Sequence, residues 1–198
     1  MKGKYIQRIF IVLAAGILIF AAARHRILAG MQEDLKENVI RFHVRANSDS
    51  KKDQEEKLKV RDAVIDYVSP YMENAETKEE ALVILKEKEG EIQKIAENTL
   101  AKQGNPQKAT VSFTTEEFPE KEYGNYVFPK GKYDAVRVDL GKAKGHNWWC
   151  VMFPDLCITK DEKVKINREA EKKMKKLLGE NTVRVIKQKK YLRWLWEL

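Results

Sequence analysis

Alternating apolar and polar positions mark most of the strands that the sequence predicts. Over 39–45 apolar side chains alternate with arginines and a histidine, and 108–114 and 136–140 repeat the alternation. A period of two is typical of strands with one buried face. The stretch 149–153 differs because every position in it is apolar. We predict a central strand there, buried on both faces.

Apolar positions three and four residues apart predict three helices, which cover 51–69, 77–100 and 166–178. Pro70 ends the first helix or bends its last turn. Thr77 and Glu80 form a capping box at the start of the second. Gly90 lies within that second helix. Glycine there lowers helix stability by roughly 1 kcal/mol relative to alanine, and it allows a local bend.

The remaining segments complete an α+β fold. Residues 182–186 predict a last strand, and 191–196 predict a short amphipathic turn of helix. Between 118 and 131, proline, glycine and aromatic residues predict a long loop. The resulting order, β-α-α-β-β-β-α-β, favours a mostly antiparallel sheet with helices packed on it, preceded by an N-terminal hydrophobic helix.

The N-terminus carries the pattern of an export signal. Lys2, Lys4 and Arg8 precede an apolar run of fifteen residues, 9–23, that ends in three alanines. This matches a secretory signal, whereas fifteen residues are few for a membrane span. A cleaved signal and a retained anchor both stay open, and in either case the bulk of the chain is exported.

The chain divides accordingly into three parts. Residues 1–30 are the signal peptide or single transmembrane anchor, 31–38 are a polar linker, and 39–198 are a single extracytoplasmic domain. A hydrophobic content of 43% and a charged content of 34% fit a globular domain. The net charge of +8 is concentrated in the tail, where 160–198 hold 13 Lys and Arg against 6 Asp and Glu. A basic tail suits anionic lipid, cell-wall polymer or nucleic acid, and selects none of them.

Cys150 and Cys157 form a candidate disulfide in an exported chain. A fully extended run would separate them by about 23 Å, at ~3.3 Å per residue, so the chain must reverse between them. A tight reversal at Pro154 would leave them just beyond bridging range, whereas a wider loop would allow the bridge. A disulfide and two buried thiols therefore both stay open.

Motifs of enzyme chemistry are weak throughout the sequence. His146 and Cys150 could pair as base and nucleophile, or with Cys157 and a further histidine bind zinc, but neither a third orienting group nor a usual metal spacing is present. Ser48 and Lys51 match the Ser-x-x-Lys pattern of penicillin-binding enzymes without its companion motifs, so helix capping explains them better. We predict no enzyme activity, no cofactor and no metal.

A charged surface is the better candidate for function. The row Arg41, His43 and Arg45 is predicted to face solvent, with Asp49, Asp53 or Asp62 needed to neutralise it. We predict that the turn 45–53 binds a partner together with one exposed tryptophan; the bland alternative is a helix cap beside two core tryptophans. The candidate residues are Arg41, His43, Arg45, Asn47, Asp49, Asp53, Arg61, Trp148 and Trp149.

Several of these segments resemble one known family. The run 39–50, which contains His-Val-Arg-Ala-Asn-Ser-Asp, resembles the start of the stage II sporulation protein R family. The run 145–157, which contains Asn-Trp-Trp-Cys-Val-Met-Phe-Pro, resembles a second segment of the same family. Weaker likeness at 53–62 and 118–133 extends the resemblance over most of 39–157.

The resemblance implies a role that the residues alone do not. Members of the family are signals exported across the forespore membrane into the intermembrane space, either secreted or anchored. There they activate a membrane-embedded aspartic protease of the mother cell, which leads to cleavage of the sigma-E precursor. The implied partners are this protease and the membrane, with no nucleic acid and no small-molecule substrate. The alternatives are an exported cell-wall hydrolase and an anchored lipid- or solute-binding module.

Overall fold

The computed structural model describes residues 2–154, 156–157 and 168–188. The predicted α+β class is confirmed. The helix predicted at 191–196, and the start of the one predicted from 166, lie outside the described residues. The elements are α1 (Lys2–Asn38), β1 (Ile40–Arg45), α2 (Lys51–Asn74), α3 (Lys78–Glu87), α4 (Glu89–Lys102), β2 (Ala109–Phe118), β3 (Lys121–Tyr123), β4 (Tyr126–Phe128), β5 (Gly131–Leu140), β6 (Asn147–Phe153) and α5 (Arg168–Gln188).

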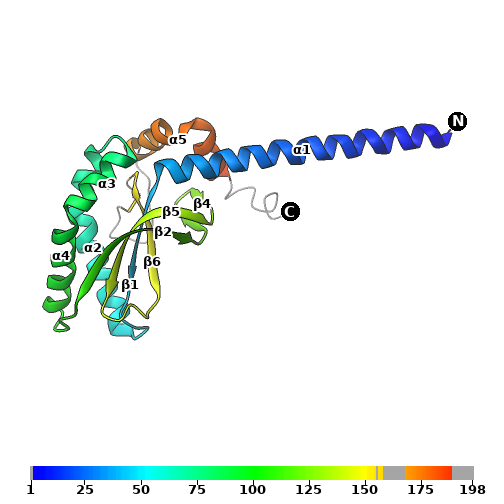
Figure 1. The fold of residues 1–198 in the computed structure, drawn as a ribbon. Helices are drawn as coiled ribbons and strands as arrows, with labels where there is room; N and C mark the ends of the chain where they lie inside the picture. The colour runs from blue at the N-terminus through cyan, green and yellow to red at the C-terminus, as the bar shows by residue number, and fades with distance from the viewer. Residues whose placement is uncertain (1, 155, 158–167, 189–198) are drawn as a thin grey trace.

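The main sheet has the strand order β2-β5-β1-β6 (Figure 1). Strand β1 runs parallel to β5 and antiparallel to β6, and β2 runs antiparallel to β5. The prediction that the Trp-Trp-Cys strand is central is wrong, because β6 lies at an edge. Residues 150–153 are nevertheless buried on both faces: Cys150 and Met152 join one hydrophobic core and Val151 joins another. An apolar run indicates that both faces of a strand are covered, but it does not indicate where in the sheet the strand lies.

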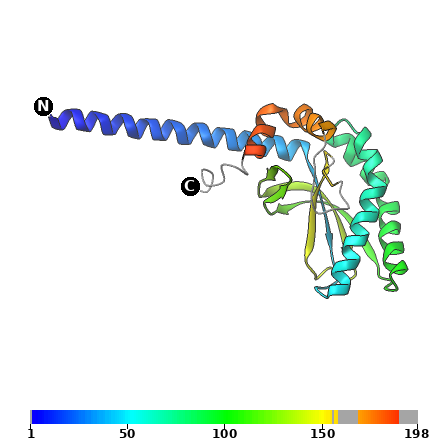
Figure 2. The ribbon, with the colours of Figure 1, turned by 180° about the vertical axis from the view of Figure 1, so that it is seen from behind.

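Helices α2, α3 and α4 cover one face of the sheet (Figures 1 and 2). The hydroxyl of Ser50 caps α2 by accepting a hydrogen bond from the backbone N–H of Asp53, at 3.2 Å. Helix α2 continues through Pro70 to Asn74, beyond the end at 69 that the sequence predicts. The predicted second helix is two helices, α3 and α4, which meet at Lys88 rather than bending at Gly90.

On the opposite face, the described residues cover the half nearest α1. The hairpin β3–β4, the end of α1 and helix α5 enclose a second core there, with Phe118, Phe128 and Tyr133 among its buried members. The segment 118–131, predicted as a loop, therefore contains a two-stranded sheet. Residues 31–38, expected to be a polar linker, continue α1 and bury Met31 and Leu35.

The predicted last strand at 182–186 is wrong, because these residues belong to α5. Helix α5 kinks at Gly179, where φ is 73° and the backbone leaves the helical region. Thr182, Val183 and Ile186 are buried, which is a helical spacing rather than an alternating one. Four β-branched residues in a row of five favour a strand locally, and packing into the second core outweighs that preference.

Candidate partner-binding surface

Two turns that are distant in the sequence form one surface, which we call the turn junction and define as residues 46–50 and 141–146. The backbone N–H of Gly145 donates to the carbonyl oxygen of Ala46 at 2.9 Å, and that of Lys144 donates to the carbonyl oxygen of Asn47 at 3.2 Å. The Asn47 side-chain oxygen accepts from the backbone N–H of Lys142 at 2.9 Å. The junction thus joins the start of α2 to the start of β6.

Two glycines permit this close approach. A Cβ atom on Gly145 would collide with the carbonyl oxygen of Ser48 and would lie 2.9 Å from Cβ of Ala46. Gly141 has a φ of 55°, and a Cβ atom there would collide with the side-chain oxygen of Asn47. Both positions therefore require glycine for the junction to form.

The carboxylate of Asp53 holds the first turn of the junction, residues 46–50, in place. It accepts hydrogen bonds from the Asn47 amide at 2.9 Å and from the Ser48 hydroxyl at 2.5 Å. The bond from Ser48 is the main cause of a lowered pKa at Asp53, so this nearly buried carboxylate stays charged. Asn47 and Asp53, which the sequence predicts as partner-binding residues, thus stabilise the conformation of this turn.

Asp49 and His146 form an exposed hydrogen-bonded pair on the turn junction. One carboxylate oxygen of Asp49 accepts from the backbone N–H of His146 at 2.6 Å and lies 2.5 Å from its ring nitrogen Nδ1. The backbone bond and then the ring bond lower the pKa of Asp49. The side chains are 53% and 81% exposed, respectively. Lys57 supports the second turn by donating to the carbonyl oxygen of His146 at 3.1 Å.

The two tryptophans point to opposite faces of β6, and each is half-buried. Trp148 packs edge-on against Phe42, and the Arg61 guanidinium lies 4.7 Å from the centre of its ring. Trp149 stacks on His43 with 4.7 Å between ring centres and 6° between ring planes. Trp148 and Arg61 therefore form a cation–π pair of the kind that also anchors partner proteins.

The expected solvent-facing cationic row is wrong for Arg41 and His43, whose exposed fractions are 0% and 1%. Arg41 donates from Nε to the carbonyl oxygen of Cys150 at 3.0 Å and from Nη2 to the hydroxyl of Tyr123 at 3.1 Å. Its guanidinium also lies 4.6 Å from the ring centre of Phe118. The hairpin and the second core cover this end of the strand, so these two residues stabilise the fold.

Arg45 remains at the surface and is neutralised from the sheet. Its guanidinium forms a bidentate pair with Asp139, with both distances 2.6 Å. Arg137 contacts the carboxylates of Asp139 and Glu116, each at 3.1 Å. The neutralising carboxylates therefore come from β2 and β5, and the expectation that Asp49, Asp53 or Asp62 supplies them is wrong. Arg137 and Asp139 lie two positions apart in the predicted strand 136–140, and this pattern is the signal in the sequence for a charged face on that strand.

Cys150 and Cys157 are bonded in a disulfide, with 5.6 Å between their Cα atoms. Both are buried. A Cys–His nucleophilic pair or a zinc site that uses Cys150 is therefore wrong. Among the residues that the structure describes, no group of three or more His, Cys, Asp or Glu side chains is arranged to hold a metal ion.

Comparison with known proteins identifies the family. A family model described as stage II sporulation protein R matches residues 36–163. This chain belongs to the stage II sporulation protein R family. Stage II sporulation protein R of Bacillus subtilis (strain 168) is 40% identical over 162 residues, which cover 79% of this chain and 72% of the relative. No solved structure matches the chain.

Membership in the stage II sporulation protein R family supports a role in sporulation and confirms the resemblance read from residues 39–157. The matched region contains both turns of the junction, the pair Arg61–Trp148 and the disulfide. His146, on the same surface, and the buried Lys57 that supports it were not among the predicted partner-binding residues. Only the hydrogen bonds of the folded chain place them beside Asp49.

Proposed function

We propose that this protein is an exported sporulation signal that activates a membrane-embedded aspartic protease of the mother cell and so leads to cleavage of the sigma-E precursor. It acts by binding, in the space between the forespore and mother-cell membranes. The apolar segment of α1 supports export, because it is long and apolar enough to cross a membrane by length and composition. A cleaved signal and a retained anchor both fit this role.

The turn junction is the surface we assign to the protease, and its construction is the observation that carries the proposal. The two segments most specific to the family, which lie about a hundred residues apart, are built into one exposed surface. Asp49 and His146 supply exposed polar groups that can orient a partner. Trp148 and Arg61 flank them with the two residue types that most often dominate binding energy at interfaces.

Binding accounts for this site better than hydrolysis does. The pair Asp49–His146 resembles the acid–imidazole half of a catalytic triad, which needs a free nucleophile next to the imidazole. Ser48, a hydroxyl in the same turn, donates a hydrogen bond to Asp53, and Cys150 is in a disulfide. A cell-wall hydrolase would lose its activity through one substitution of a nucleophile or acid, whereas a binding surface would lose it through several neighbouring residues.

Co-expression in a non-sporulating host tests the proposal directly. The host would express the membrane protease and the sigma-E precursor, with and without this chain, and the relative from Bacillus subtilis would serve as the positive control. We expect cleaved precursor only when this chain or the relative is present. Cleavage with the relative but not with this chain would overturn the proposed function.

A further inference from the structure

Helix α1 joins the apolar segment to the domain without a hinge. The helix is continuous from Lys2 to Asn38, and its last two turns are packed into the second core through Met31 and Leu35. Lys78 donates from Nζ to the carbonyl oxygen of Lys36 at 2.6 Å, and the hydroxyl of Thr182 hydrogen-bonds to Asp34. The direction of α1 therefore sets the orientation of the domain.

This continuity places the domain against the membrane when the apolar segment spans it. A hydrocarbon layer of about 30 Å takes about 20 helical residues, which runs from Tyr5 to Arg24. At about 1.5 Å per residue, the first fully buried contact, Met31, lies only about 10 Å further along the axis. The C-terminal half of α5 and the hairpin β3–β4 lie on the side of the domain toward the N-terminus of α1 (Figures 1 and 2).

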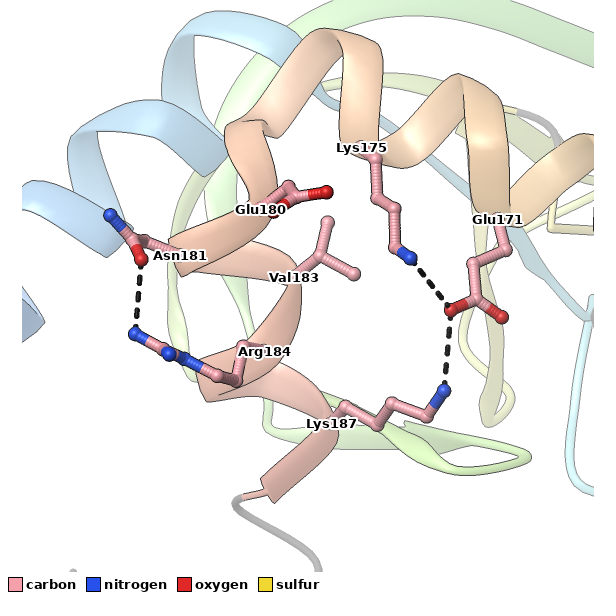
Figure 3. A pocket seen from close by; sticks show the side chains of 7 residues that line it. All are labelled: Glu171, Lys175, Glu180, Asn181, Val183, Arg184 and Lys187. Carbon is pink, nitrogen blue, oxygen red and sulfur yellow. Dashed lines mark hydrogen bonds and ion pairs between the residues drawn. The ribbon is translucent and has the colours of Figure 1, made fainter.

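A charged hollow opens at the kink of α5 on this side (Figure 3). Its volume is about 330 Å³, and it is lined by Glu171, Lys175, Glu180, Asn181, Val183, Arg184 and Lys187. Lys175 and Lys187 approach the Glu171 carboxylate from two sides, at 3.6 and 3.2 Å. Arg184 is exposed and donates to the side-chain oxygen of Asn181 at 3.0 Å. Two lysines thus meet at Glu171, and Arg184 lies beside Asn181 on the other side of the hollow, which also holds Glu180 (Figure 3).

We propose that this hollow binds the phosphate of an anionic phospholipid headgroup in the membrane that α1 spans. The planar guanidinium of Arg184 suits two phosphate oxygens at once, and Lys187 and Lys175 add positive charge at the Glu171 side of the hollow. Because α1 is packed into the domain without a hinge, the hollow stays on the side of the domain that faces the membrane. The inference rests on α1 being retained as a span and does not depend on activation of the protease.

Hydrogen exchange of the full-length protein in nanodiscs tests the site. In discs that contain phosphatidylglycerol, we expect backbone exchange over 179–188 to be roughly tenfold slower than in phosphatidylcholine discs, since each cation near an anionic surface adds roughly a factor of five in affinity. The double variant Arg184→Gln/Lys187→Gln should lose this protection. If that variant melts earlier than the wild type, Arg184→Gln alone replaces it, because Arg184 is exposed and contacts Asn181 on its own helix.

A matched variant separates the hollow from general charge attraction. Lys94→Gln/Lys102→Gln removes two exposed cations from α4, on the opposite side of the sheet, and should keep the protection. Equal protection in both kinds of disc, or equal loss in both double variants, would overturn the proposal. Inorganic phosphate added to phosphatidylcholine discs is the last arm, and full protection by phosphate alone would show a site for free phosphate instead of lipid.

Discussion

His43 shows how burial changes the role of a single residue. Its imidazole lies under Trp149 and is 1% exposed, and burial lowers its pKa from 6.5 to about 4 despite the nearby Glu116 carboxylate. Between these two pH values the unfolded chain binds a proton that the folded chain does not. The stabilising effect is complete above pH 6.5 and is lost as the pH falls through about 4, by up to about 3 kcal/mol.

Denaturant unfolding measured between pH 7 and pH 4 checks this prediction. The free energy of unfolding of the wild type should fall with decreasing pH more steeply than that of His43→Gln, which cannot take up this proton. The other titratable groups are present in both proteins, so the difference between the two curves isolates the protonation of His43. Parallel curves would contradict the burial of a neutral imidazole at this position.

Gly145 is a second residue whose role is set by its surroundings. In Gly145→Ala the new methyl group would meet the carbonyl oxygen of Ser48, so the turn junction must shift. We expect a loss of about 1–3 kcal/mol in the free energy of unfolding. Gly90→Ala is the matched control, because the space around Gly90 in α4 is open and alanine favours a helix by up to about 1 kcal/mol. Equal melting temperatures of the two variants would refute the close approach.

At the scale of elements, the disulfide determines how the chain leaves β6. The bond joins Cys150 in the strand to Cys157 just beyond it, and the backbone N–H of Leu156 donates to the carbonyl oxygen of Val151 at 3.1 Å. The reversal is thus wider than a two-residue turn, which is what the bridge requires. The loop that it closes is short, so the expected stabilisation is modest.

The double variant Cys150→Ala/Cys157→Ala should lose about 2–3 kcal/mol in the free energy of unfolding, the value for a short loop in the chain-entropy model. Mass spectrometry without reductant should show the wild type lighter by two hydrogens than its reduced form. Wild type kept in reductant should unfold like the variant. Labelling of both cysteines by maleimide in the unfolded, unreduced protein would exclude the bridge.

For the whole molecule, the question is whether the turn junction serves the fold or a partner. Asp49 bonds to His146 across the junction and accepts a hydrogen bond from the Gln54 side chain at 3.3 Å, and its side chain is 53% exposed. Asp49→Ala should therefore melt within a few degrees of the wild type, because exposed ion pairs contribute little to stability. We expect the same variant to lose activation of the protease in the co-expression host.

Glu87→Ala removes an exposed carboxylate from the end of α3, away from the junction, and should keep full activation. Both variants would be compared at equal amounts of folded protein, judged by melting temperature. If every inactive junction variant is also unfolded, the junction is structural and the partner binds elsewhere. Activation by Asp49→Ala at the wild-type level would remove the Asp49–His146 pair from the binding surface.

Local patterns in the sequence were sufficient for much of this protein. The period of two located β1, β2 and β5, and the capping residue Thr77 located the start of α3. The apolar N-terminal helix, the α+β class and the family also followed from short stretches of residues. These properties depend on neighbours in the chain, because hydrogen-bonded caps and side-chain periodicity are set within a few residues.

The tertiary structure decided which faces are covered and which distant residues meet. Arg41 and His43 occupy positions that alternate with apolar ones, which is the pattern of an exposed face. They are buried only because the second core packs over this end of β1. Packing into the second core also makes 182–186 helical and 31–38 part of α1, and the hydrogen bonds of the turn junction place Asp49 against His146. Burial and long-range pairing are sums over contacts between remote segments, and therefore neither the periodicity nor the composition of one segment contains them.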